Sequence, residues 1–141
     1  MALIRTTRWL KSVPAFQQYK ATTPCQLDQA ELRLKQKLPG ELRQWLLIMG
    51  FGDLSDCIAI REEWLEELTD APVAGHVVFA QDELGDWLTW QPSAESIWLV
   101  SRSLRGYGKL SEGFRAFIEE LVDRRFHWQQ WTDSLELTPI E

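Results

Sequence analysis

The sequence contains little cysteine and little histidine, and it has no long apolar run. Its two cysteines, Cys25 and Cys57, are too few for a disulfide framework and lack the spacing of a metal-binding pair, which fits thiols in a reducing compartment. The longest uninterrupted apolar run, residues 45–49, has five residues, whereas a membrane-spanning helix needs about 20. Basic residues break up the apolar start of the chain, so we expect no export signal. These absences predict a cytoplasmic protein without disulfides or a membrane span.

The signatures of common catalytic and cofactor sites are also missing. Neither the phosphate-binding loop nor the dinucleotide-binding glycine motif occurs, and Gly50-Phe51-Gly52 and Gly106-Tyr107-Gly108 are interpreted as turns. His76 and His127 have no second metal ligand at helical spacing, so no zinc site is expected. Cys57 and His76 are close enough in the pattern to meet in a sheet, but nothing local marks either as activated. We therefore predict no cofactor, no metal and no enzymatic activity.

What is present is the composition of an ordinary globular domain. Of the 141 residues, 45% are apolar and 26% are charged, which makes extensive disorder unfavourable. A chain of about 150 residues buries about 70% of its unfolded surface, so one domain can fold without disulfides or metals. The eight tryptophans are the unusual part of the composition.

The net charge of −6 is unevenly distributed. Residues 1–52 hold eight basic and three acidic residues, whereas residues 53–96 hold one basic and eleven acidic residues. Residues 97–141 are nearly balanced, with six basic and seven acidic residues. An acidic middle third favours a basic partner and argues against binding to the phosphate backbone of nucleic acids. The alternative is that these acids only solvate a helix and two turns.

One small cluster of cations and aromatics interrupts this pattern. Arg102, Arg105 and Lys109 lie around Tyr107 and follow Trp98, which is the only such grouping that a nucleotide can use. Three positive charges beside a strongly acidic block are a weak basis for nucleic-acid binding. We therefore predict no nucleic-acid partner.

Two helices are expected in the first third of the chain. Asp28 and Glu31 have the spacing of a helix N-cap and its reciprocal partner, which predicts a helix over residues 28–37. Pro39 suits the first turn of a second helix, and Gly50 is placed to end it. The apolar residues of this second helix recur at helical spacing and predict its core face: Leu42, Trp45, Leu46 and Met49.

The acidic middle third is predicted to begin with a strand and a helix. Residues 57–60 have the apolar, β-branched pattern of a short strand, and residues 61–68 are predicted to form an acidic helix. In that helix Trp64, Leu65 and Leu68 are expected to face inward. The expected solvent-facing residues are all glutamates: Glu62, Glu63, Glu66 and Glu67.

Three further apolar segments predict an antiparallel meander. The strands are expected over residues 76–80, 86–90 and 97–100, with Trp90 paired to Ile97. This register places two apolar pairs on opposite faces of the sheet: Leu88 with Trp90, and Trp87 with Trp98. Either both faces are covered, by the N-terminal arm or by the tail with its two tryptophans, or one tryptophan pair is an exposed contact patch.

Three carboxylates, Asp82, Glu83 and Asp86, cluster around the first turn of the meander. Carboxylates so placed can hold Mg²⁺ or serve as acid and base, although a polar hairpin turn is the interpretation we favour.

A final helix completes the predicted fold. Ser111 is a good N-cap, and the residues that follow it at helical spacing are Phe114, Phe117, Ile118, Leu121 and Val122. Helices, then strands, then a helix predict a single α+β domain in which helices pack on one face of a mostly antiparallel sheet.

The order and spacing of these motifs carry a resemblance to a known family. In chain order they are Glu31 and Leu34, Leu38-Pro39, Trp45-Leu46, Gly50-Phe51-Gly52, Ile58-Ala59-Ile60, Trp64-Leu65, Val78-Phe79-Ala80, Gly85-Asp86-Trp87, Ile97-Trp98, and Ser111 with Phe114, Phe117 and Leu121. Together they resemble the SUKH superfamily, the fold shared by fungal cell-wall-synthesis regulators and many bacterial immunity proteins. Met49 stands where that family usually has Asn. The resemblance covers residues 27–125, flanked by an arm or short docked helix over residues 1–26 and a tail over residues 126–141.

The resemblance implies a non-enzymatic binding module. Bacterial members usually bind a cognate toxin domain, often a nuclease or deaminase, and block it inside the producing cell. The acidic middle third fits this role, because toxins that act on nucleic acids tend to be basic. The expected contact residues are acidic side chains around one tryptophan: Glu62, Glu63, Glu66, Glu67, Asp82, Glu83, Asp86 and Trp87. A regulatory or scaffold module in cell-envelope synthesis or secretion is the alternative, and an enzyme that uses the three turn carboxylates is a third possibility.

Overall fold

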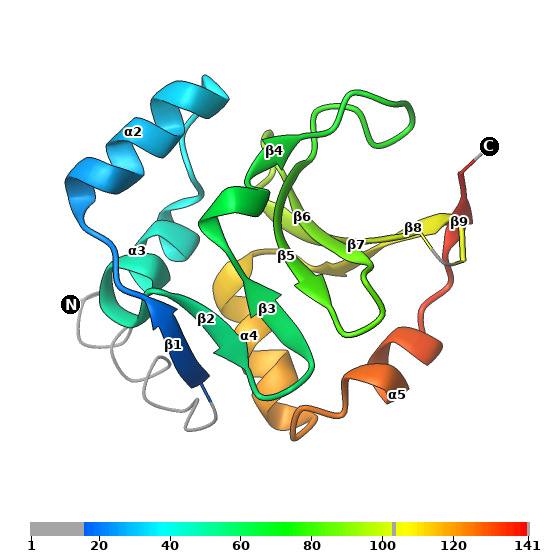
Figure 1. Ribbon diagram of the computed structural model, residues 1–141. Coiled ribbons are helices and arrows are strands. Elements are labelled where there is room, and N and C mark those ends of the chain that lie inside the picture. Colours follow the sequence, from blue (N-terminus) through cyan, green and yellow to red (C-terminus); the bar gives the residue numbers. More distant parts are fainter. Residues whose placement is uncertain (1–15, 103, 141) are drawn as a thin grey trace.

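The computed structural model describes residues 16–102 and 104–140 (Figure 1). Its strands form one antiparallel sheet in the order β1-β2-β3-β5-β6-β7-β8-β9, and β4 also pairs with β5. The strands are β1 (Phe16–Lys20), β2 (Phe51–Leu54), β3 (Ile58–Ile60), β4 (Glu66–Glu67), β5 (Val77–Asp82), β6 (Trp87–Gln91), β7 (Ser96–Ser101), β8 (Gly106–Ser111) and β9 (Thr138–Pro139). The helices are α2 (Pro24–Leu34), α3 (Gly40–Met49), α4 (Phe114–Asp123), α5 (Trp128–Asp133) and the short 3₁₀ helix η1 (Glu62–Trp64). The predicted α+β class is confirmed.

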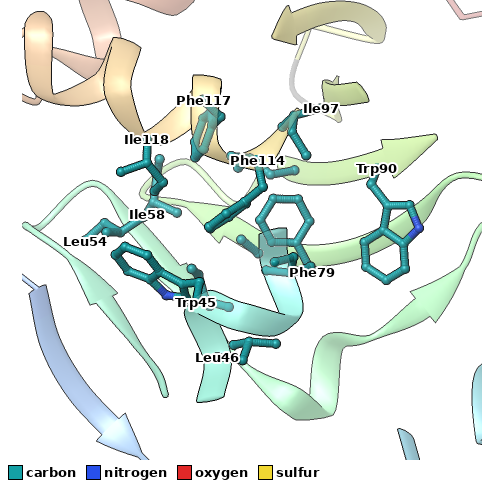
Figure 2. Packing of buried hydrophobic residues seen from close by; sticks show 14 of the residues in the cluster. Trp45, Leu46, Leu54, Ile58, Phe79, Trp90, Ile97, Phe114, Phe117 and Ile118 are labelled. Atoms are coloured by element: carbon teal, nitrogen blue, oxygen red, sulfur yellow. The ribbon is translucent and has the colours of Figure 1, made fainter. Parts of the chain in front are cut away.

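The helices pack on one face of the sheet. The buried residues of α2, α3, α4 and α5 all belong to one hydrophobic cluster, together with the inward side chains of the strands. Aromatic rings form the centre of this cluster, where Phe114 lies 5.7 Å from Trp45 and 5.8 Å from Phe79 between ring centroids (Figure 2). Burial of large apolar side chains is the main source of folding free energy, so this layer is what holds helices and sheet together.

Helix α2 begins four residues before the predicted start. Its N-cap is Thr23, whose hydroxyl accepts a hydrogen bond from the Gln26 backbone N–H while the Gln26 side chain accepts one from the Thr23 backbone. Pro24 occupies the first turn, where its missing N–H costs nothing. The prediction of residues 28–37 was wrong at both ends because the stronger capping box lies upstream, and because Lys35 adopts a left-handed conformation that ends the helix.

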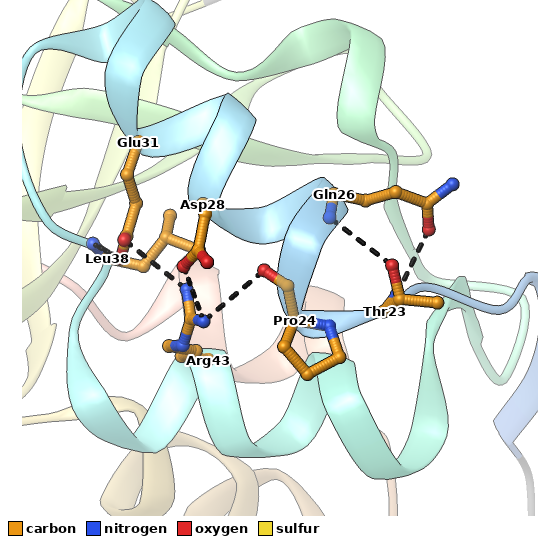
Figure 3. Close-up of polar contacts among 7 residues, drawn as sticks. All are labelled: Thr23, Pro24, Gln26, Asp28, Glu31, Leu38 and Arg43. Atoms are coloured by element: carbon orange, nitrogen blue, oxygen red, sulfur yellow. Dashed lines mark hydrogen bonds and ion pairs between the residues drawn. The ribbon is translucent and has the colours of Figure 1, made fainter.

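The two acids that suggested the predicted cap instead join α2 to α3 (Figure 3). The Arg43 guanidinium lies 2.9 Å from an Asp28 oxygen and 3.3 Å from a Glu31 oxygen. The second Glu31 oxygen accepts a hydrogen bond from the Leu38 backbone N–H at 2.8 Å. The sequence spacing was therefore meaningful, but as a tertiary contact between helices.

Helix α3 agrees with its prediction, but the segment after it differs from the predicted turn. Gly50 has φ +81° and ends the helix at Met49, but Gly52 belongs to β2 and not to a turn. A Cβ atom at position 52 would lie 2.3 Å from the Gln17 carbonyl oxygen, so glycine is needed there for β1 to pair with β2. Pro39 precedes the helix as its N-cap residue.

The predicted acidic helix over residues 61–68 was wrong. The chain forms only the single turn of η1 and then the short strand β4 along β5. Glutamates at positions 62 and 66, and at 63 and 67, would lie one turn apart in a helix, and like charges at that spacing repel. Strand β3 also ends at Ile60, which leaves the edge of β5 free for β4 at Val77 and Val78.

The meander and its register are confirmed. Trp90 pairs with Ile97 and Trp87 pairs with Val100, and a turn with Gly85 at φ +83° joins the first two strands. Strand β5 carries a β-bulge at Phe79, which lets both Phe79 and Ala80 face the core.

The C-terminal third adds an edge that the sequence did not predict. Gly106 and Gly108, interpreted as a turn, lie in β8, where Leu137 approaches so closely that a Cβ would meet its side chain at 2.9 Å and 3.0 Å respectively. Ser111 is not the N-cap of α4: its hydroxyl donates to the carbonyl of Gly113, which is the cap residue. Beyond α4, the tail folds as α5 and β9.

The predicted N-terminal helix or arm lies mostly outside the described residues. Its described end, from Phe16, is strand β1.

Candidate binding pocket on the helix-free face of the sheet

The sheet face opposite the helices carries the second tryptophan pair. Leu88 and Trp90 point into the core with exposed fractions of 0% and 1%, whereas Trp87 and Trp98 lie half-buried on the other face. The helix-free face is therefore the one that offers large aromatic surface to a partner, and Val100 lies beside Trp87 on it.

Neutral groups fill the middle of this face. The His76 Nδ1 atom lies 3.0 Å from the Thr89 hydroxyl, and the His76 ring packs edge-on against Trp98 at 5.5 Å. Trp98 in turn packs beside Tyr107 at 6.0 Å. Burial lowers the pKa of His76, so the imidazole is held in its neutral form. This part of the face is a packed aromatic layer.

A pocket of about 360 Å³, which we call the sheet pocket, opens at one end of this face. Trp87 and Val100 form an apolar part of its lining, and Val73 and Ile140 add to it from the loop after β4 and from the C-terminal segment. Figure 1 shows this loop projecting beyond the sheet between β4 and β5. The pocket thus lies where the loop and the C-terminal segment overhang the sheet.

Backbone hydrogen bonds close the loop at its base. The Leu68 N–H donates to the His76 carbonyl at 2.7 Å, and the Gly75 N–H donates to the Leu68 carbonyl at 2.8 Å. Within the loop, the Val73 N–H donates to the Asp70 carbonyl at 3.1 Å. The loop is therefore a fixed wall of the pocket.

Four exposed carboxylates of η1, β4 and the loop after it form what we call the acidic ridge, and all but the first line the pocket: Glu63, Glu66, Glu67 and Asp70. Among the described residues, no cation lies within ion-pair distance of any of them. Glu67 only accepts a hydrogen bond from the Gln36 amide at 3.3 Å. The ridge carboxylates thus have no direct ion pair among the described residues, although the charge of Glu63 also acts on Lys20.

The predicted contact residues fall into two groups. Glu66, Glu67 and Trp87 meet in the sheet pocket, and Glu63 lies on the adjoining ridge. Glu62 is engaged with Lys20 at 2.9 Å, and the same contact raises the pKa of Lys20.

The second group, at the turn between β5 and β6, is mostly buried. One Asp82 oxygen accepts from the backbone N–H groups of Leu84 and Asp86, both at 2.9 Å, and the other accepts from the Trp128 indole at 3.0 Å. Asp86 accepts from the Ser101 hydroxyl at 3.0 Å and the Arg102 N–H at 2.9 Å. These two carboxylates hold the turn, so they have little surface for a partner.

Glu83 is exposed on the same turn but lies outside the sheet pocket. In the described part of the chain, no group of three or more His, Cys, Asp or Glu residues is arranged to hold a metal ion.

Two arginines complete the pocket, and sequence reasoning did not assign them to it. Arg102 and Arg105 line the same pocket from the segment between β7 and β8, and the Arg102 guanidinium lies 4.9 Å from the centre of the Trp87 ring. Lys109, which the sequence grouped with them, pairs with Glu112 instead. The predicted register could have placed Arg102 in this pocket. Trp87 pairs with Val100, and residue 102 follows Val100 by two positions, on the same face of the sheet.

Cys57 lacks the surroundings of an activated nucleophile. The Cys57 thiol is buried and donates to the Leu54 carbonyl at 3.3 Å, and burial raises its pKa to about 11. His76 contacts Thr89, so the two groups do not form the pair considered from sequence.

Comparison with family models, with curated proteins and with solved structures finds no match. No helix among the described residues has both the length and the apolar character needed to cross a membrane.

Proposed function

We propose that this chain is a non-enzymatic protein-binding module, of the immunity type, that neutralises a basic toxin domain acting on nucleic acids. The observation that carries the proposal is the acidic ridge: four exposed carboxylates without a cation partner among the described residues, beside a tryptophan-containing pocket. An aromatic anchor bordered by unpaired charge is typical of protein interfaces. The resemblance to the SUKH superfamily supports the same role.

The charge of the ridge supports a basic partner for a physical reason. Exposed charges of one sign attract an oppositely charged protein over several ångströms and raise its association rate, and salt screens this attraction. The proposal therefore predicts binding that is fast at low ionic strength and weakens as salt is added.

The test compares two variants with equal changes in net charge. One reverses the ridge (Glu63→Lys, Glu66→Lys, Glu67→Lys), and the control reverses three exposed acids on the α4 and α5 side (Asp123→Lys, Asp133→Lys, Glu136→Lys). Each tagged protein is used to retain partners from the native cytoplasm at low and high salt, and the retained proteins are identified by mass spectrometry.

The parent and control proteins are expected to retain the same basic protein at low salt and to lose it at high salt, while the ridge variant does not retain it. With the purified partner, reversing the ridge should weaken the dissociation constant at least about tenfold and abolish protection of cells that express that partner. Equal retention by the ridge variant would overturn the proposal. Charge-independent recovery of cell-envelope or secretion components would support the scaffold function instead.

A further inference from the structure

The sheet pocket has two walls of opposite charge. The loop wall carries Glu66, Glu67 and Asp70, and the arginine wall carries Arg102 and Arg105. The apolar surfaces of Trp87 and Val100 line the same cavity. Among the described residues, no ion pair joins the two walls, so five charged side chains line one cavity without a direct ion pair between acids and arginines.

This arrangement defines the charge of a complementary guest. A purely anionic guest, such as a phosphate group, would meet the arginine wall but would be repelled by three carboxylates. A purely cationic guest would be attracted by the loop wall and repelled by the two arginines. Only a guest with a cation at one end and an anion at the other satisfies both walls.

The lining also indicates what lies between the two charges of the bound segment. The face of Trp87 already carries the Arg102 guanidinium at 4.9 Å, which shows that this ring accommodates a planar cation. The methylene stem of a lysine or arginine side chain packs well on such apolar surfaces while its charged end reaches a polar wall. A cavity of about 360 Å³ has room for a side chain and a short stretch of backbone.

We propose that the sheet pocket binds a bipolar segment of the protein partner, in which a lysine or arginine lies next to an aspartate or glutamate in sequence. The basic side chain is held by the loop wall, its stem lies on Trp87, and the neighbouring carboxylate is held by the arginine wall. This inference rests on the proposed function for the guest being a protein, but it is tested without the partner.

The probes are three short peptides: Ac-Gly-Arg-Asp-Gly-NH₂, its citrulline form in place of arginine, and its asparagine form in place of aspartate. Each substitution removes one charge and almost nothing else. Binding is followed by NMR, through the indole N–H signal of Trp87 assigned with Trp87→Phe. The doubly charged peptide is expected to bind about two- to fivefold more tightly than either singly charged form, the range of an exposed ion pair.

Two variants assign each charge to its wall. In Glu66→Gln/Glu67→Gln/Asp70→Asn, exchanging arginine for citrulline should no longer weaken binding, while exchanging aspartate for asparagine still should. In Arg102→Gln/Arg105→Gln the reverse is expected, and the single variant Arg105→Gln repeats this test at an exposed position away from the Trp87 ring.

Several results would overturn the inference. They are equal affinity for all three peptides, no change of the Trp87 signal, an exchange of the two walls' effects, or tighter binding of free arginine than of the doubly charged peptide. Failure of this inference can be told apart from failure of the proposed function, because Glu63 does not line the pocket. If the proposed function is wrong, Glu63→Lys leaves partner binding unchanged, whatever the peptides show.

Discussion

At the scale of single residues, burial decides what a polar side chain does. Asp82 and Asp86 belong to the same acidic middle third as Glu66 and Glu67, but the first two hold a turn with their oxygens while the second two face a pocket. A carboxylate that accepts several internal hydrogen bonds is a structural group, because breaking those bonds leaves buried donors unsatisfied. Composition alone does not separate these roles.

The burial of His76 predicts a measurable pH dependence of the free energy of unfolding. Burial lowers the pKa of His76 below its ordinary value of 6.5, so the unfolded chain takes up a proton at higher pH than the folded protein. The stability that His76 contributes is therefore fully present above the unfolded-state pKa and is lost as pH falls through the lower folded-state pKa. We expect His76→Asn to lose less free energy of unfolding between pH 7 and pH 5 than the parent, measured by urea denaturation.

The control for this experiment is the second histidine. His127 is exposed, so His127→Asn is the matched histidine substitution against which the pH dependence of His76→Asn is compared. An unchanged pH dependence in His76→Asn would contradict the assigned effect of burial on His76.

At the scale of elements, close approach between strands explains a glycine that the sequence pattern had assigned to a turn. Gly52 lies in β2 beside β1, and a Cβ there would come within 2.3 Å of the Gln17 carbonyl oxygen. A Cβ at Gly40, at the start of α3, has nothing within 4 Å. We expect Gly52→Ala to lower the free energy of unfolding by more than about 1 kcal/mol, because β1 must move away from β2. Gly40→Ala should raise it by about 0.5 kcal/mol, because alanine favours the helix.

Thermal and urea unfolding of both variants measure this difference. A Gly52→Ala protein as stable as the parent would mean that β1 and β2 have room for a methyl group between them.

Elements with strong local patterns were the ones that the sequence predicted well. Helices α3 and α4 have a strong apolar repeat, and the residues predicted to form their core faces are buried or partly buried. The register of the meander was predicted correctly because the alternation of apolar residues and the turn residues are local signals. The helix predicted over residues 61–68 was wrong because its glutamates repel at helical spacing and the free edge of β5 pairs with β4 instead.

At the scale of the whole molecule, the C-terminal tail is tied to the first turn of the meander. The Trp128 indole N–H donates to Asp82 across 46 residues of chain, and its ring packs against Phe117 at 6.2 Å. Trp128→Phe keeps an aromatic ring but leaves one oxygen of a buried carboxylate without its donor, which should cost about 1–3 kcal/mol.

Trp131→Phe is the matched comparison, since Trp131 is equally buried in α5 and stacks on Phe117 at 5.7 Å. It should cost less than Trp128→Phe in urea unfolding, because it removes mainly packing area. A larger loss for Trp131→Phe would show that the tail is held by packing and not by the bond to Asp82.

The sequence by itself determined the fold class, the helices α3 and α4, the meander and the excess of acidic charge in the middle third. All of these depend on neighbours within a few residues, whose periodicity and turn chemistry are visible in one dimension. Only the tertiary structure decided that β1, β2, β8 and β9 extend the sheet, that Asp82 and Asp86 are buried, and that Arg102 and Arg105 line one pocket with Glu66 and Glu67. These features depend on pairing between segments far apart in the chain, and no local pattern specifies which distant strand or side chain will supply the partner.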